Sequence, residues 1–242
     1  MSERLYIAIP VRGRKRLAYE CIKTIDDARY DVNGASLHGD ILALYEDGAD
    51  QLGEAALCAD EIHRSLEPIG IDRQRAQHFI DFWNRREREG LTHLYLTDAD
   101  APHDVLWREN LLRLQHLFGG APICGYRTET HAKYIGNVYR DDPGEGVLFQ
   151  RFAPGVSYLL TVEHVGRVME RIHMLKDWDW MVPALLGHKF AVSRISYVDH
   201  IGRGGEHDPK DGSIGRERAT NPTEWLVEKR EEIITNLDHA HS

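Results

Sequence analysis

The segment Leu91–Asp100 limits the possible folds of this chain more than any other. It reads Leu-Thr-His-Leu-Tyr-Leu-Thr and then ends in Asp98-Ala99-Asp100. The apolar, aromatic and β-compatible residues predict a central strand that is covered on both faces. Residues two apart on an extended chain project to the same side, so Asp98 and Asp100 are expected to face one object together. Adjacent carboxylates repel unless a cation offsets them, which favours a divalent cation carrying a diphosphate; an Asp-rich turn that caps the next helix is the alternative.

Strand and helix patterns alternate through the first half of the chain. Leu5–Pro10 and Asp40–Tyr45 have the composition of buried strands. The segments from about Arg14 to Arg29 and from Gly70 to Gly90 have the apolar spacing of amphipathic helices. This alternation predicts an α/β fold with a parallel core.

The second half predicts shorter elements. We expect short strands at 122–126, 134–139 and 147–150, a helix at 162–175, a strand at 189–192 and a last strand at Arg194–Val198. Near the C-terminus, Asn221, Pro222 and Glu224 are typical of a helix start, with Asn221 as the cap. That helix would dock on the body of the protein or on a second subunit of a homodimer.

Several of these segments, in this order, resemble the motifs of nucleotide-sugar glycosyltransferases of the GT-A fold, family 2 in particular. Glu46–Asp50 is similar to the acidic turn after their second strand, Gly70–Ala76 to their glycine-to-arginine segment with Ala76 in place of its asparagine, and Asp98–Asp100 to their Asp-x-Asp motif. The resemblance implies an α/β fold of GT-A type: a Rossmann-like, mostly parallel central sheet flanked by helices, with a small antiparallel hairpin region. It also implies these donor-binding residues: Pro10, Val11, Arg12, Glu46, Asp47, Arg75, Asp98, Ala99, Asp100 and Arg203.

The segment Lys176–Trp180 resembles the family 2 segment that carries the catalytic base, with Lys176 in place of its glutamate. By that correspondence Asp177 is the general base that deprotonates an acceptor hydroxyl, and Asp179 is second choice. An Asp177 base implies single displacement with inversion at the anomeric carbon. Asp177 as a helix N-cap is the alternative interpretation of its place in the sequence.

The resemblance also implies an acceptor surface. Gly155 lies in a segment similar to the glycine-containing strand on which acceptors rest. Trp178 and Trp180 would pack over the C–H face of a sugar, because flat aromatic side chains supply contact area at little entropic cost. Core packing of both indoles is the alternative.

A third metal ligand is implied after the last expected strand, where some GT-A enzymes carry a histidine. His200 takes this position, so the metal would be held by Asp98, Asp100 and His200, and imidazole with carboxylates suits Mn²⁺, with Mg²⁺ also possible. The chain has 14 histidines, and a packing role is the alternative for any one of them. Glycines at 202, 204 and 205 predict a loop that closes and brings Arg203 to the diphosphate.

Composition restricts partners and compartment. The net charge of -9 and the pI of about 5.9 do not favour binding to nucleic acid or to an anionic membrane by the chain as a whole. Arg12–Arg16 is a basic exception that suits a diphosphate, a phosphorylated acceptor or a DNA backbone, or simply a solvated helix start. No apolar stretch approaches the ~20 residues of a membrane span, no signal-peptide core is present, and three cysteines lack a paired or metal-binding spacing. We therefore expect a cytoplasmic protein.

The resulting hypothesis is one GT-A catalytic domain over 1–242, with a nucleotide-binding half at 1–118, an acceptor and metal half at 119–205, and a C-terminal loop and helix at 206–242. Its activity would be metal-dependent transfer of a sugar from a nucleoside-diphosphate sugar, a UDP-sugar first, to an acceptor hydroxyl. A glycan, a lipid-linked intermediate, a small molecule or a modified nucleic acid would each fit as acceptor. The alternatives are a retaining glycosyltransferase of the same fold, a sugar nucleotidyltransferase and a non-catalytic sugar-nucleotide-binding protein.

Overall fold

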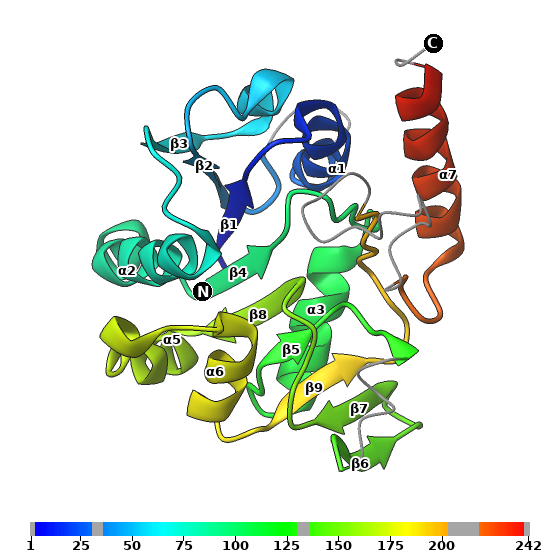
Figure 1. Ribbon diagram of the computed structural model, residues 1–242. Coiled ribbons are helices and arrows are strands. Elements are labelled where there is room, and N and C mark those ends of the chain that lie inside the picture. Colours follow the sequence, from blue (N-terminus) through cyan, green and yellow to red (C-terminus); the bar gives the residue numbers. More distant parts are fainter. Residues whose placement is uncertain (1–2, 31–35, 130–135, 203–217, 240–242) are drawn as a thin grey trace.

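The computed structural model describes residues 3–30, 36–129, 136–202 and 218–239. Within them, the strands form one nine-stranded sheet in the order β3-β2-β1-β4-β8-β5-β9-β7-β6, which Figure 1 shows running from β3 to β6. Strands from both halves of the chain share this sheet, because β8 pairs with β4 at its centre.

The first half supplies the parallel part of the sheet. The strands β1 (Leu5–Val11), β2 (Ile41–Asp47), β3 (Glu61–Ser65) and β4 (His93–Thr97) are parallel to one another. They are joined through α1 (Lys15–Asp27), the short 3-10 helix η1 (Gly53–Cys58) and α2 (Ile71–Glu89). β1, β2 and β4 are buried almost throughout, as the apolar sequence of a central parallel strand requires.

The second half adds a mixed region. β8 (Ser157–Thr161) runs antiparallel to β4 and to β5 (Ile123–Cys124), which pairs in parallel with β9 (Phe190–Ser193). The hairpin of β6 (Val138–Asp142) and β7 (Val147–Gln150) closes the edge beside β9. The helices here are α3 (Trp107–Leu117), α5 (Val162–Met169), η2 (Ile172–Met174), α6 (Trp178–Leu185) and α7 (Glu224–His239).

Two apolar cores cover the two faces of the sheet. In β1, Tyr6 and Ala8 belong to the core that includes residues of α2, α5 and α6, whereas Ile7 and Ile9 belong to the core that includes residues of α1 and α3. Successive side chains of a strand point to opposite faces of the sheet, so this alternation shows that β1 is covered on both faces. A third, smaller cluster joins α1 to α7. The carboxyl ends of the parallel strands therefore lie between two packed layers, with the loops that follow them at one edge of the sheet.

Several sequence expectations differ from the structure. Glu46 and Asp47 are the last residues of β2 and not part of a turn. Asp98 to Asp100 form a turn in which Ala101 N–H donates to Asp98 O at 3.3 Å, so their carboxylates are not set by an extended chain. The expected helix at 162–175 ends at Met169 and gives way to η2.

The predicted strand at Arg194–Val198 is wrong. This segment makes isolated bridges from Ser196 to Pro222 and from Val198 to His103, because it crosses between neighbours without following one of them. The cap of α7 also differs: Leu226 N–H donates to Thr223 Oγ1 at 3.2 Å, so Thr223 and not Asn221 supplies the oxygen.

Candidate metal centre

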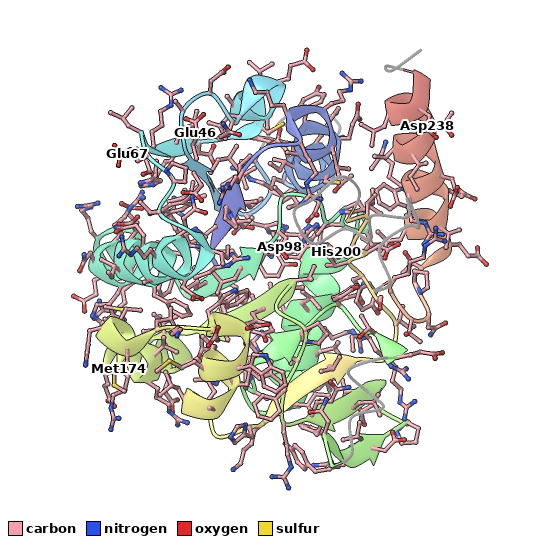
Figure 2. All side chains as sticks on the ribbon, viewed as in Figure 1. Glu46, Glu67, Asp98, Met174, His200 and Asp238 are labelled. Carbon is pink, nitrogen blue, oxygen red and sulfur yellow. The ribbon has the colours of Figure 1, made fainter. Side chains whose placement is uncertain are left out.

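Asp98, Asp100 and His200 converge just beyond the carboxyl end of β4. One ligand atom of each lies within 4.8 Å of the others. Figure 2 shows the labelled Asp98 and His200 close together beside the end of β4. Two carboxylates and an imidazole are a donor set that suits Mn²⁺ and accepts Mg²⁺, so these residues fit a divalent cation.

Backbone pairing brings His200 to Asp100. Ile201 N–H donates to Asp100 O and Asp199 N–H donates to Pro102 O, both at 3.1 Å, and His103 bridges to Val198. The residues that follow β4 and those that carry His200 therefore run side by side. A Cβ on Gly202 would lie 3.2 Å from Cε1 of the His200 ring, so the ring packs closely over this glycine.

Asp98 is backed by a buried arginine. The Arg75 guanidinium is fully buried and donates through one nitrogen to Asp98 Oδ1 at 2.5 Å and to Thr97 O at 3.0 Å. It also stacks over the Trp178 ring at 4.4 Å. Burial raises the pKa of Asp98 and lowers that of Arg75, because the surrounding protein reduces the hydration of each charged group. Arg75, expected to bind the donor, lies behind Asp98 and holds that carboxylate in place.

Asp100 is shared between His200 and Arg14. His200 Nε2 lies 3.2 Å from Asp100 Oδ1, and Arg14 donates to Asp100 Oδ2 at 2.8 Å. Burial raises the pKa of Asp100, but the two cations lower it more, to about 2. Burial lowers the pKa of His200, but the Asp100 carboxylate raises it more, to about 9. The metal-free site is therefore an Asp100–His200 ion pair, and a divalent cation would replace the imidazole proton.

The start of α6 is held by α2. Asp72 accepts the backbone N–H groups of Asp177 and Trp178, each at 3.1 Å, so Asp72 is the group that caps α6. Asp177 adopts a left-handed conformation with φ of 48° and its side chain makes no capping hydrogen bond. The alternative interpretation of Asp177 as an N-cap residue is therefore wrong for its side chain, which is exposed.

Asp179 packs against Gly155. It is the second residue of α6 and is half-buried, and burial raises the pKa of its carboxyl. A Cβ on Gly155 would lie 2.8 Å from Trp178 Cζ2 and 3.0 Å from Asp179 Cβ, so only glycine fits at this contact. Gly155, Asp179 and Trp178 thus form one packed unit that reaches Asp98 through the Arg75 guanidinium.

The two indoles of α6 differ in exposure. Trp178 is 6 % exposed and packs in the core, which was the alternative to acceptor binding in the sequence analysis. Trp180, in contrast, is 48 % exposed. Trp180 lies 4.6 Å from the Phe152 ring, which lies 4.8 Å from the His188 ring. Sequence analysis missed Phe152 and His188, because nothing in their local sequence places them beside Trp180.

The remaining donor candidates lie along β1 and β2. Pro10 and Val11 end β1 with Val11 fully buried, and the Arg12 side chain is 51 % exposed, 3.9 Å from Asp47. Gln51 N–H donates to Glu46 at 2.5 Å and Ile69 N–H donates to Asp47 at 2.6 Å, so both acids hold loops. Ala99 lies in the turn between the two metal-ligand candidates, and Arg203 lies outside the described residues.

Comparison with solved structures shows the type of fold, whereas comparison with family models and curated proteins finds no match. Among solved structures, the chain resembles residues 1–349 of TarS from S. aureus in complex with UDP-GlcNAc, with a TM-score of 0.57 and 7% identity over 84% of this chain and 60% of that one. It also resembles the longer TarS structure, with a TM-score of 0.54 and 7% identity over 81% of this chain and 36% of that one. The fold is therefore α/β of the GT-A glycosyltransferase type, as the sequence motifs predicted.

The chain spans only part of these neighbours, 36% of TarS and 60% of its 1–349 fragment. In the part of the chain that the structure describes, no helix is both long enough and apolar enough to cross a bilayer.

Proposed function

We propose that this protein is a divalent-metal-dependent glycosyltransferase that moves a sugar from a nucleoside-diphosphate sugar to an acceptor hydroxyl. The observation that carries the proposal is the convergence of Asp98, Asp100 and His200 beyond β4 of a GT-A fold. The cation held there would offset the charge that develops on the departing diphosphate. TarS binds UDP-GlcNAc and UDP, which makes a UDP-sugar the first donor to test.

Charge around the site supports diphosphate binding. Arg12 and Arg14 follow β1, and Arg14 already contacts Asp100 at 2.8 Å. In the proposed complex the two guanidinium groups contact the diphosphate, while Arg75 keeps Asp98 oriented from behind. Pro10, Val11, Glu46, Asp47 and Ala99 stay predicted donor contacts, as does Arg203.

We propose Asp179 as the first candidate for the general base and keep Asp177 as the second. Two observations support this order. Asp179 is half-buried with a raised pKa, and the adjacent Trp178 lies against the Arg75 guanidinium that contacts Asp98, whereas Asp177 is exposed. A carboxylate whose pKa moves toward the working pH accepts the hydroxyl proton more effectively. Inversion of the anomeric centre follows from either base.

The acceptor is proposed to lie over α6, with Gly155 and Trp180 at its contact surface. Trp180, Phe152 and His188 present adjacent rings, and an exposed ring suits the C–H face of a sugar. A cytoplasmic location and a homodimer stay predictions of the sequence.

The proposal is tested first by a thermal-shift panel of UDP-, GDP-, dTDP- and CDP-linked sugars, each with Mn²⁺ and with chelator. A ligand that binds the native state raises the melting temperature, so we expect a metal-dependent rise for one nucleotide class. Product analysis then separates the alternatives: release of nucleoside diphosphate supports transfer, release of pyrophosphate indicates a nucleotidyltransferase, and binding without turnover indicates a non-catalytic protein.

The base is tested with the matched pair Asp179→Asn and Asp177→Asn. Loss of a general base costs about 10²–10⁴-fold in rate, so we expect that loss in kcat for Asp179→Asn and a change of a few-fold for Asp177→Asn. The opposite ranking would return the role to Asp177. Retention of the anomeric configuration in the first-formed product, measured by NMR, would exclude a base-assisted single displacement by either residue.

A further inference from the structure

The helix α7 contacts both residues that flank His200 in the chain. On one side, Arg230 of α7 donates to Asp199 Oδ2 at 2.9 Å. On the other side, Ile201 packs with Ile233 of α7 in the small apolar cluster that also holds residues of α1. Figure 1 shows α7 along the side of the molecule that α1 occupies. The metal-ligand candidate therefore sits between two contacts made by one helix.

Both carboxylate oxygens of Asp199 accept hydrogen bonds. The residue is 0 % exposed. Its Oδ1 accepts the backbone N–H of His200 at 2.8 Å and that of Ala219 at 2.9 Å, while its Oδ2 accepts from Arg230. The carboxylate thus holds the backbone amide of His200 directly. A buried carboxylate needs a charged partner, and the Arg230 side chain, 11 % exposed, supplies it.

Ile201 is fixed at the same time by backbone and side chain. Its N–H donates to Asp100 O at 3.1 Å, and its side chain is 1 % exposed in the cluster with Leu17, Cys21 and Ile233. Movement of α7 away from α1 would expose Ile201 and leave the Asp199 charge unpaired. Either change would loosen the backbone on one side of His200.

We propose that α7 is a positioning element for the metal centre, in which Arg230 acts through Asp199, and Ile233 through Ile201, to hold the His200 imidazole opposite Asp100. The inference rests on the proposed metal site. Groups behind a metal ligand orient it, and their loss commonly weakens metal binding by 10–100-fold. Arg230 is a positioning residue, because it acts on His200 through Asp199.

The test measures Mn²⁺ binding to the full chain by the EPR signal of free Mn²⁺, without donor or acceptor. We expect Arg230→Gln to weaken binding about tenfold and Arg230→Lys to restore most of it, because lysine keeps a charge for Asp199. The matched control is Lys229→Gln, which removes a charge from the same helix and, among the described residues, breaks the pair with Glu232 at 3.0 Å; it should leave Mn²⁺ affinity unchanged. Ile233→Ala tests the second contact and should also weaken binding.

Melting temperatures in EDTA and far-UV circular dichroism separate positioning from loss of fold. Unchanged Mn²⁺ affinity in folded Arg230→Gln and folded Ile233→Ala would overturn the inference, whatever their melting temperatures. Equal weakening in Arg230→Gln, Arg230→Lys and Lys229→Gln would overturn it too, because it would indicate a general charge effect. Failure of the proposed metal site itself would give a different result. The wild-type protein would then bind no Mn²⁺, or the Asp100→Asn variant would bind Mn²⁺ with the same affinity as the wild type.

Discussion

Two acidic segments lie at the carboxyl ends of β2 and β4, the two strands that flank β1 in the sheet, and they do different things. At the end of β2, Glu46 and Asp47 each accept a backbone N–H from a nearby loop and lie beside an arginine, with Arg64 Nε 3.1 Å from Glu46. Beyond β4, Asp98 and Asp100 instead converge with a histidine from a distant part of the chain.

The difference teaches that position after a strand does not by itself make a carboxylate a ligand. Glu46 and Asp47 are 5 % and 3 % exposed, and their oxygens serve local structure. The Asp98 side chain is 29 % exposed, and Asp100 is paired with His200 and Arg14. A metal ion would take the place of the His200 proton, and a diphosphate would accept hydrogen bonds from the Arg14 guanidinium. We therefore expect loss of acids beyond β4 to change metal binding and loss of acids in β2 to change stability.

The largest effect is expected from Asp100→Asn, which removes the carboxylate shared by His200 and Arg14. Mn²⁺ affinity should fall at least about 100-fold, beyond the usual cost of changing a group behind a ligand, and the metal-dependent rise in melting temperature should disappear. The matched control, Asp47→Asn, removes one charge from the other segment and should keep Mn²⁺ affinity within about twofold, because Asp47 is not a ligand candidate and salt screens charges over longer distances. Equal losses in the two variants, measured by EPR titration, would erase the distinction between the segments.

The next effect is a pH dependence of Mn²⁺ affinity, which we expect for the segment beyond β4. The pKa of His200 is about 9, above its ordinary 6.5, so proton release must accompany metal binding below pH 9. One released proton raises the apparent Mn²⁺ affinity about tenfold per pH unit between pH 6.5 and 8.5. Affinity that stays constant over this range would exclude a protonated His200 as the group displaced. Asp47→Asn should leave the slope unchanged.

The raised pKa of His200 also predicts that the stability of the metal-free protein depends on pH. Because the folded pKa of about 9 exceeds the ordinary 6.5, the charged imidazole stabilises the fold fully below about pH 6.5, and this contribution is lost as pH rises through about 9. In EDTA, the melting temperature of wild type should exceed that of His200→Gln at pH 6 and approach it above pH 9. A constant difference across this range would contradict the Asp100–His200 ion pair.

The smallest effect belongs to Asp47. Asp47→Ala leaves the Ile69 N–H without its acceptor, which costs about 1–3 kcal/mol of unfolding free energy in urea titrations with chelator. Asp50→Asn is the matched control, since Asp50 is exposed, pairs with Lys15 at 2.8 Å and has a φ of 55° that asparagine tolerates; no measurable change is expected. Unchanged stability together with lost nucleotide binding in Asp47→Ala would instead make Asp47 a donor contact, as the family resemblance implies.

Local patterns in the sequence predicted most of the fold and part of the site. β1, β4 and α2 were expected within a few residues, because a run of apolar residues or a helical spacing is a local signal. β3 was missed, since a half-exposed edge strand such as Glu61–Ser65 has charged residues on its open face.

Contacts between distant residues were beyond local reasoning. Arg75 matched a motif, but its place behind Asp98 depends on a helix and a strand packing together. The contact of Arg230 with Asp199 joins residues 31 positions apart in the chain, and a periodic pattern in the sequence does not predict such a contact. His200 could be named from the resemblance, whereas its approach to Asp100 results from the pairing of Ile201 with the turn beyond β4.

The metal centre is tested most directly by diffraction at the manganese edge from crystals grown with Mn²⁺ and UDP. We expect an anomalous peak in bonding contact with Asp98, Asp100 and His200, with the diphosphate of UDP between this peak and the side chains of Arg12 and Arg14. A peak at another place, or UDP bound with no peak between Asp98, Asp100 and His200, would contradict the proposed metal centre.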